Sequence, residues 1–141
     1  MNYIKINIFI LLLGLLSSCA RNVQNGVISD DMEEEINKAR SLFMRLDDSL
    51  TVKEKELLHK LETFLYEGTT LKNGKLEINF SKDDFKKMGV PDIYYSILKS
   101  DIEDINRYND TLSAPFPELF EKSWLESVED YYIRKKPQPP E

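Results

Sequence analysis

The chain has 141 residues, of which 41% are hydrophobic and 31% charged, and its net charge is −6. This length fits a single domain. An acidic balance without a basic stripe argues against nucleic acid as a partner, because phosphate recognition needs clustered Lys and Arg. The composition therefore predicts one small folded domain that does not bind nucleic acid.

The first residues form a candidate secretory signal peptide over residues 1–18. Lys5 supplies a positive charge, and residues 8–16 (IFILLLGLL) are an unbroken apolar run. The run is shorter than the roughly 20 residues that a membrane-spanning helix requires. Such a segment is typical of a signal that is removed from the mature protein.

The end of this segment, Leu16-Ser17-Ser18-Cys19, resembles the lipobox of bacterial lipoproteins. The resemblance implies that the signal peptidase recognises Leu16, Ser17 and Ser18, and that Cys19 becomes a diacylated N-terminal residue. More than one acyl chain, such as palmitate, gives stable attachment to a membrane. The family's sorting rule, with Ala20 instead of Asp after the cysteine, favours the outer membrane. The alternative is an uncleaved anchor in which Cys19, the only cysteine, is a buried thiol.

Residues 20–29 show no periodicity, which predicts a flexible tether between the lipidated Cys19 and the folded part. The predicted organisation is a lipidated cysteine and tether (19–29), a single helical domain (30–133) and a Pro-rich tail (134–141). The domain is expected to be mainly α, with four to five short helices and one small two-stranded β-hairpin. It starts with an αα-hairpin, because only a short link at 47–49 separates its first two helices.

The first helix is expected to begin at about residue 30 and to end before the link at 47–49. Its apolar residues recur at spacings of three and four, which places them on one face; they are Met32, Ile36, Ala39, Phe43, Leu46 and Leu50. Five acidic residues crowd its start at 30–35. We interpret them as matched to the helix dipole and not as a cation site, because no glycine turn of a calcium loop is present.

The second helix is expected to begin at Thr51-Val52-Lys53-Glu54, which has the pattern of a capping box. Its apolar face consists of Leu57, Leu58, Leu61, Phe64 and Leu65. Gly68 is predicted to end it as a left-handed cap. The period then changes to two, and Asn73-Gly74 favours a type I′ turn, so a hairpin is predicted over residues 69–72 and 75–80.

Three further helices are predicted in the second half. The first begins after Ser81, buries Phe85 and Met88, and ends at Gly89. The next starts at Pro91, carries inward residues Tyr94, Ile97, Leu98, Ile102 and Ile105, and runs to about residue 106, before a loop at 109–115. The last begins at Pro117, and its inward or partly inward residues are Leu119, Phe120, Trp124, Leu125, Val128 and Tyr132.

The sequence offers little material for catalysis. His59 is the only histidine, so neither a nucleophile–base pair nor a histidine metal cluster can be assembled from it. No glycine-rich phosphate loop or nucleophile elbow is present. We therefore expect no enzyme activity, no cofactor and no metal site. Paired carboxylates of the kind that cleave glycosides stay open as a minor alternative, since the chain has many acidic residues.

The candidate partner-binding residues are two adjacent pairs of tyrosines, Tyr94-Tyr95 and Tyr131-Tyr132. Adjacent residues on a helix point in different directions, so one ring of each pair should be exposed. Exposed tyrosines suit protein interfaces and sugar stacking, whereas a role at the border of the core is the structural alternative. The leading hypothesis is a non-catalytic, lipid-anchored envelope protein that binds another envelope protein. It would be an accessory subunit of an envelope complex or a toxin-neutralising protein; the alternative is a small-ligand or glycan binder.

Overall fold

The structure is a computed structural model that describes residues 29–137. The predicted signal peptide, Leu16-Ser17-Ser18-Cys19 and all of the tether except Ser29 lie outside the described residues. The elements in chain order are α2 (Asp30–Met44), the 3₁₀ turn η2 (Asp47–Ser49), α3 (Val52–Glu67), β1 (Thr69–Lys72), β2 (Lys75–Ile78), α4 (Lys82–Lys87), α5 (Asp92–Thr111) and α6 (Phe116–Lys135). The described part therefore confirms a mainly helical fold with one small antiparallel hairpin.

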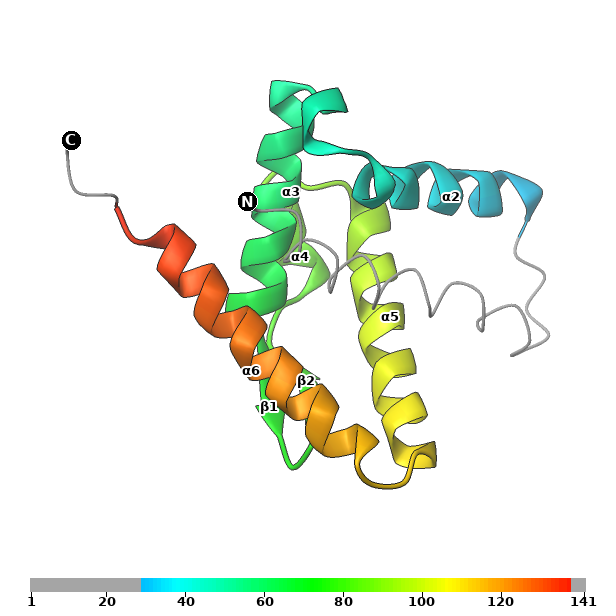
Figure 1. Ribbon diagram of the computed structural model, residues 1–141. Helices are drawn as coiled ribbons and strands as arrows, with labels where there is room; N and C mark the ends of the chain where they lie inside the picture. The colour runs from blue at the N-terminus through cyan, green and yellow to red at the C-terminus, as the bar shows by residue number, and fades with distance from the viewer. Residues whose placement is uncertain (1–28, 138–141) are drawn as a thin grey trace.

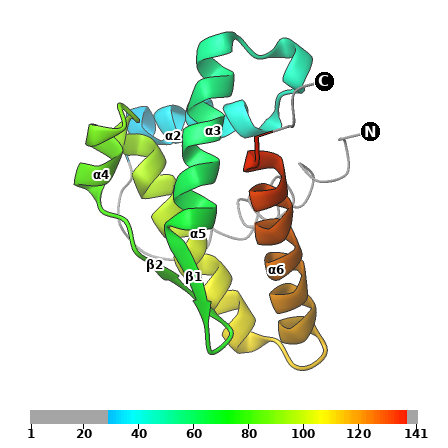
Figure 2. The ribbon, with the colours of Figure 1, turned by 90° about the vertical axis from the view of Figure 1, so that its left-hand side faces the viewer.

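Helix α5 is the centre of the arrangement, because α2, α4 and β2 all contact it. The hairpin continues directly from the end of α3 and lies beside α5, while α6 occupies an outer position (Figure 2). Helix α2 runs across the end of α5 (Figure 1). The structure differs from the expected αα-hairpin in one way. A short link joins α2 to α3, but α2 packs chiefly on α5 and not on α3.

The core lies between α2, α3, β2, α4, α5 and α6. Its buried apolar residues are Ala39, Leu42, Phe43, Leu61, Phe64, Leu65, Leu76, Phe85, Val90, Tyr94, Ile97, Leu98, Ile102, Ile105 and Trp124. An aromatic cluster joins α3 to α4: the rings of Phe64 and Phe85 stack with centroids 4.0 Å apart, and Phe80 packs on both. Burial of these large rings contributes to the hydrophobic stabilisation of the fold.

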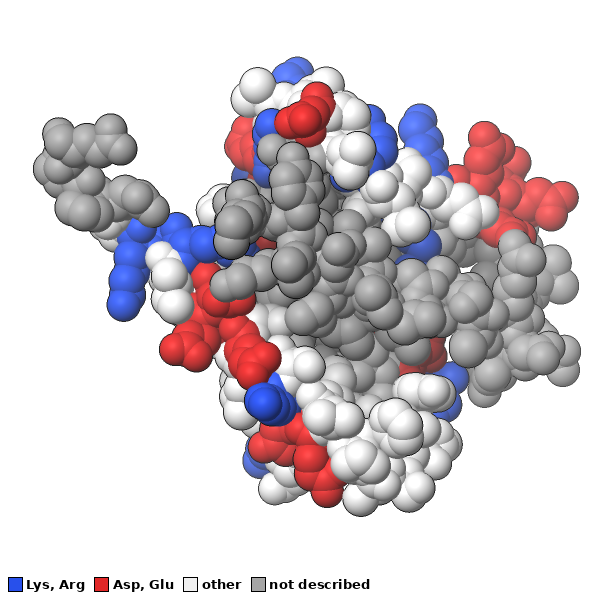
Figure 3. All heavy atoms as spheres, viewed as in Figure 1, with Lys and Arg blue, Asp and Glu red and all other residues white. Residues whose placement is uncertain are grey.

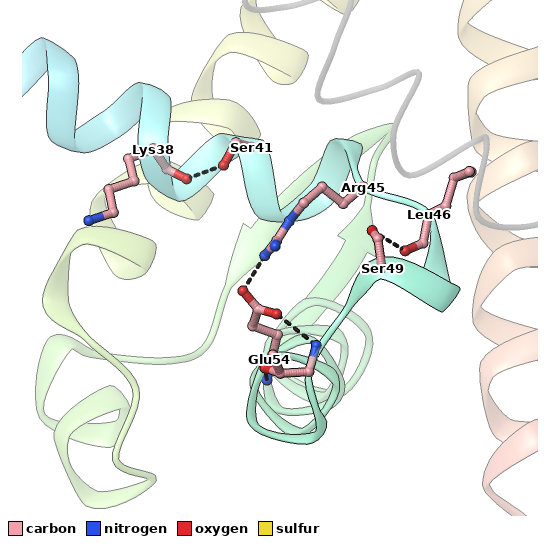
Figure 4. Close-up of polar contacts among 7 residues, drawn as sticks. Lys38, Ser41, Arg45, Leu46, Ser49 and Glu54 are labelled. Atoms are coloured by element: carbon pink, nitrogen blue, oxygen red, sulfur yellow. Dashed lines mark hydrogen bonds and ion pairs between the residues drawn. The ribbon is translucent and has the colours of Figure 1, made fainter.

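The start of α3 is fixed by the predicted capping box. The Thr51 hydroxyl accepts from the Glu54 amide at 3.3 Å, and the Glu54 carboxylate accepts from the Thr51 amide at 2.7 Å. The second carboxylate oxygen of Glu54 pairs with Arg45, just beyond the end of α2 (Figure 4). Hydrogen bonds from Arg45 and from the Thr51 backbone lower the pKa of Glu54 to about 2. Local polar contacts therefore set where α3 begins.

Helix α2 is shorter than predicted. It ends at Met44, because Arg45 is extended and the next residues form the turn η2, where the Ser49 amide and hydroxyl both donate to the Leu46 carbonyl. Leu46 is consequently exposed, as is Met32 near the N-terminus of α2, so neither is the core residue that the spacing predicted. Leu42, which the prediction omitted, is buried.

Gly68 is the C-cap of α3, but the reason for a glycine there differs from the one predicted. Its φ is −94°, so it is not a left-handed cap. A Cβ at this position would lie 2.5 Å from the Phe64 carbonyl oxygen and 2.7 Å from the Phe80 ring, so the lack of a side chain is what is required. In the hairpin turn, by contrast, Asn73 and Gly74 both have positive φ, as a type I′ turn demands. The strands pair with Lys72 opposite Lys75, as the predicted turn requires, but β2 ends at Ile78, two residues before its predicted end.

The remaining helix boundaries also differ from the prediction. Met88 follows the end of α4 and is exposed, while Val90 is buried. Helix α5 begins after Pro91 and continues to Thr111, into the segment predicted as a loop. Helix α6 begins at Phe116 and reaches Lys135, two residues into the predicted tail. The chain is therefore helical over more of its second half than the sequence pattern indicated.

The residues predicted to lie inward or partly inward on α6 differ widely in exposure. Leu119, Leu125 and Tyr132 are about half exposed. Trp124 is buried as predicted, and Tyr131, which the prediction omitted from the core, is only 1% exposed. The apolar residues of α6 lie on both of its sides, so no single stripe marks the side that packs on the domain.

Candidate interaction surface

The contact between α6 and α3 centres on Tyr131. Its hydroxyl donates to Glu67 at 2.6 Å and lies 3.1 Å from the Thr63 hydroxyl. Its ring stacks on Tyr66, with centroids 5.2 Å apart, and Tyr66 also packs against Trp124 at 5.7 Å. Burial raises the pKa of Tyr66 to about 12. Tyr131 is thus a structural residue that fixes α6 to α3.

The basic residues at the end of α6 are engaged by α3. Lys135 pairs with Glu67, and Arg134 pairs with Glu62 at 3.3 Å. The hydrogen bond from Lys135, followed by that from Tyr131, holds the pKa of Glu67 below its usual range. Because Arg134 and Lys135 pair with α3, their positive charges do not balance the acidic residues in the rest of α6.

The structure separates the two tyrosine pairs. Tyr94 is buried, with its ring 6.1 Å from Phe43 in an edge-on contact. Tyr95 is half-buried, and its ring contacts are with Phe80 and Phe85. Tyr131 is buried, whereas Tyr132 is 46% exposed. One ring of each pair is thus the more exposed, but the pairs belong to different aromatic clusters and do not form one site.

A surface that the sequence analysis missed lies on the opposite side of α6 from Tyr131. Its apolar residues Leu119, Leu125 and Ile133 are each more than half exposed. A shallow hollow, open to solvent, runs along the same side and is lined by Glu118, Glu121, Lys122, Leu125, Glu126 and Glu129. Acidic side chains accordingly form a row along α6 (Figure 3). The sequence feature that indicates this surface is the presence of apolar residues on all sides of α6, with Glu between the outer leucines.

We call this surface the α6 outer face, and define it by Leu119, Leu125 and Ile133 together with Glu118, Glu126 and Glu129. Within the described residues, Glu118 and Glu129 make no ion pair, and Glu126 has only a 4.0 Å pair with Lys122. Exposed apolar groups flanked by unneutralised carboxylates are chemically suited to contact another macromolecule.

Among the ionisable residues outside the α6 outer face, His59 is exposed on α3. Asp101 is buried on α5 and forms a two-point ion pair with Arg40 of α2, at 2.6 and 3.2 Å; burial nevertheless raises its pKa above the ordinary value. Across residues 29–137 there is no group of three His, Cys, Asp or Glu side chains that could hold a metal. The helices of this part are also too short or too polar to cross a membrane.

Comparison with known proteins gives no relative for this chain: no family model, no curated protein and no solved structure matches it.

Proposed function

We propose that this chain is a lipid-anchored protein of the bacterial envelope that acts by binding another protein and not by catalysis. The observation that carries the proposal is the sequence Leu16-Ser17-Ser18-Cys19 directly after the apolar run at 8–16. Acylation of Cys19 would attach the domain stably to the membrane. With Ala20 after the cysteine, the outer membrane is the favoured location in a cell that has one.

The α6 outer face supports the binding part of the proposal. Trp124 and Tyr131 already fix α6 to the domain, so Leu119, Leu125 and Ile133 are not needed for that packing. A ligand- or glycan-binding protein usually encloses its ligand in a pocket, whereas the hollow on α6 is open. The arrangement therefore favours a protein partner over a small ligand. An accessory subunit of an envelope complex and a toxin-neutralising protein both fit.

Acylation is tested by comparing wild-type protein with Cys19→Ser in cells supplied with a labelled fatty acid. The proposal predicts label only in the wild type, and wild-type protein in the membrane fraction. Ser18→Ala is the matched control, because it keeps a small residue before the cysteine and should still be labelled. Equal labelling of wild type and Cys19→Ser, or labelling of neither, would refute the anchor.

A further inference from the structure

The most informative feature outside the packed core is the spacing of residues on the α6 outer face. Leu119, Leu125 and Ile133 are spaced by six and eight residues, which at 3.6 residues per turn keeps them on the half of α6 that faces away from Tyr131. Glu118, Glu126 and Glu129 lie on the same half. An exposed apolar strip bordered by charges along one side of a helix is a surface on which an amphipathic helix can pack.

The exposure of these residues shows that this side of α6 has no helical neighbour within the described residues. Leu119 and Leu125 are each 54% exposed and Ile133 is 56% exposed. A helix that contacts its domain on one side normally carries polar residues on the other. Helix α6 therefore has apolar surface beyond what its attachment to α3 uses.

The charge of the α6 outer face restricts what can cover it. Its carboxylates at 118, 126 and 129 leave the surface acidic, since Lys122 alone lies among them while Arg134 and Lys135 pair with α3. A second copy of the chain would bring two acidic rows together, and an anionic lipid surface would repel them. Opposite charge is the arrangement that favours association.

We propose that the α6 outer face binds a cationic amphipathic helix of a partner protein. Its apolar residues would pack on Leu119, Leu125 and Ile133, and its Lys or Arg side chains would pair with Glu118, Glu126 and Glu129. This inference rests on the proposed protein-binding function and specifies the surface and the partner's chemistry. Helix-on-helix packing then supplies affinity, and the charge pairs supply orientation and discrimination.

The test uses the full chain in detergent micelles and a labelled helical peptide of about three heptads, with Leu at positions a and d and Lys at e and g. A peptide with Glu in place of Lys is the control ligand. The proposal predicts binding of the Lys peptide only, weakening as salt is added. Failure to bind it, or equal binding of the Glu peptide, would overturn the proposal.

Two sets of variants localise the binding. The triple change Glu118→Gln/Glu126→Gln/Glu129→Gln should weaken binding of the Lys peptide about tenfold or more, with unchanged circular dichroism. The matched control neutralises three exposed glutamates on other elements, Glu56→Gln/Glu77→Gln/Glu103→Gln, and should change binding less than about twofold. Equal loss in both triple variants would mean attraction by net charge alone and would overturn the proposal.

Two further measurements address other occupants of the α6 outer face. Self-association of the full chain that the outer-face triple variant alters would assign the surface to a second copy. Slower hydrogen exchange of α6 in phosphatidylglycerol than in phosphatidylcholine vesicles would assign it to lipid. Either result would overturn the proposal. A labelled, membrane-bound chain that does not bind the Lys peptide would refute this inference and leave the lipid anchor intact, so the two failures are distinguishable.

Discussion

The side chain of Asn106 on α5 bonds both backbone groups of Leu76 on β2. Its carbonyl oxygen accepts from the Leu76 amide at 2.8 Å, and its amide nitrogen donates to the Leu76 carbonyl at 2.8 Å. A carboxamide thus pairs with the free edge of the short strand as a neighbouring strand would. Because an isolated hairpin is marginally stable, this two-point contact helps to explain why β2 stays on α5.

Removing the Asn106 side chain should therefore destabilise the fold. Asn106→Ala leaves two partly buried backbone groups of Leu76 without their partners, at a cost of about 1–3 kcal/mol. Asn79→Ala removes an exposed bond to Thr70 and is the matched control, with an expected cost within about 0.5 kcal/mol. Urea unfolding of both variants measures the difference. Equal stabilities would show that Asn106 does not hold the strand.

Loss of Arg40, the partner of the buried Asp101, should strongly lower the stability of the fold. Asp101 is 2% exposed, and Arg40→Leu would leave its carboxylate buried without a counter-charge, at a cost of about 3–5 kcal/mol near neutral pH. The double variant Arg40→Leu/Asp101→Leu should recover much of this loss, because an apolar pair can replace a buried ion pair. Equal destabilisation of the single and double variants would contradict this explanation.

The same variant should show a characteristic pH dependence. Burial raises the pKa of Asp101 and Arg40 partly offsets that shift, so Arg40→Leu should raise the pKa further. A carboxyl with a raised folded-state pKa stabilises the fold below its unfolded pKa, and this contribution is lost as the pH rises through the folded-state pKa. The deficit of Arg40→Leu against wild type should shrink on acidification. A deficit that is constant between neutral and acidic pH would refute this reasoning.

The tyrosines of α6 should separate into a structural and a surface residue. Tyr131→Ala removes a ring that is 1% exposed and should cost about 3–5 kcal/mol. Tyr132→Ala should change the free energy of unfolding by less than about 0.5 kcal/mol, since that ring is 46% exposed. Thermal or urea unfolding of the two variants provides the comparison. A large loss in Tyr132→Ala would place its ring in the core.

Two leucines, one on α3 and one in the link before it, form a matched pair for mutation. Leu61 is fully buried on α3, whereas Leu46 is 73% exposed in the link before it. Leu61→Ala should cost about 2–5 kcal/mol of unfolding free energy. Leu46→Ala makes the same chemical change and should cost less than about 0.5 kcal/mol. If urea unfolding gave equal losses for the two, the assignment of the buried face would be wrong.

Features set by neighbouring residues could be predicted from the sequence. The Thr51–Glu54 capping box and the Asn73-Gly74 turn depend on residues within a few positions of each other, and both occur as predicted. The mainly helical fold follows from the apolar periodicity. Helix ends were less predictable: the hydroxyl and amide bonds of Ser49 end the first helical segment at a place that the spacing of apolar residues did not indicate.

Features that depend on contacts between distant segments could not be predicted. Arg40 and Asp101 are 61 residues apart, so their pairing, which ties α2 to α5, has no local signal. Helix α6 is apolar on two sides, and the pattern alone does not tell which side packs on Tyr66 and which is exposed. For this reason the sequence pattern predicts Tyr131 as a candidate binding residue and does not indicate the α6 outer face.

The most direct test of the central claim is mass spectrometry of the mature chain purified from membranes. The lipid anchor predicts that the N-terminal residue is Cys19 and that the N-terminal peptide carries the mass of a diacylglyceryl group, with or without a third acyl chain. A mature chain that begins at Met1, or a Cys19 without added lipid, would contradict the claim.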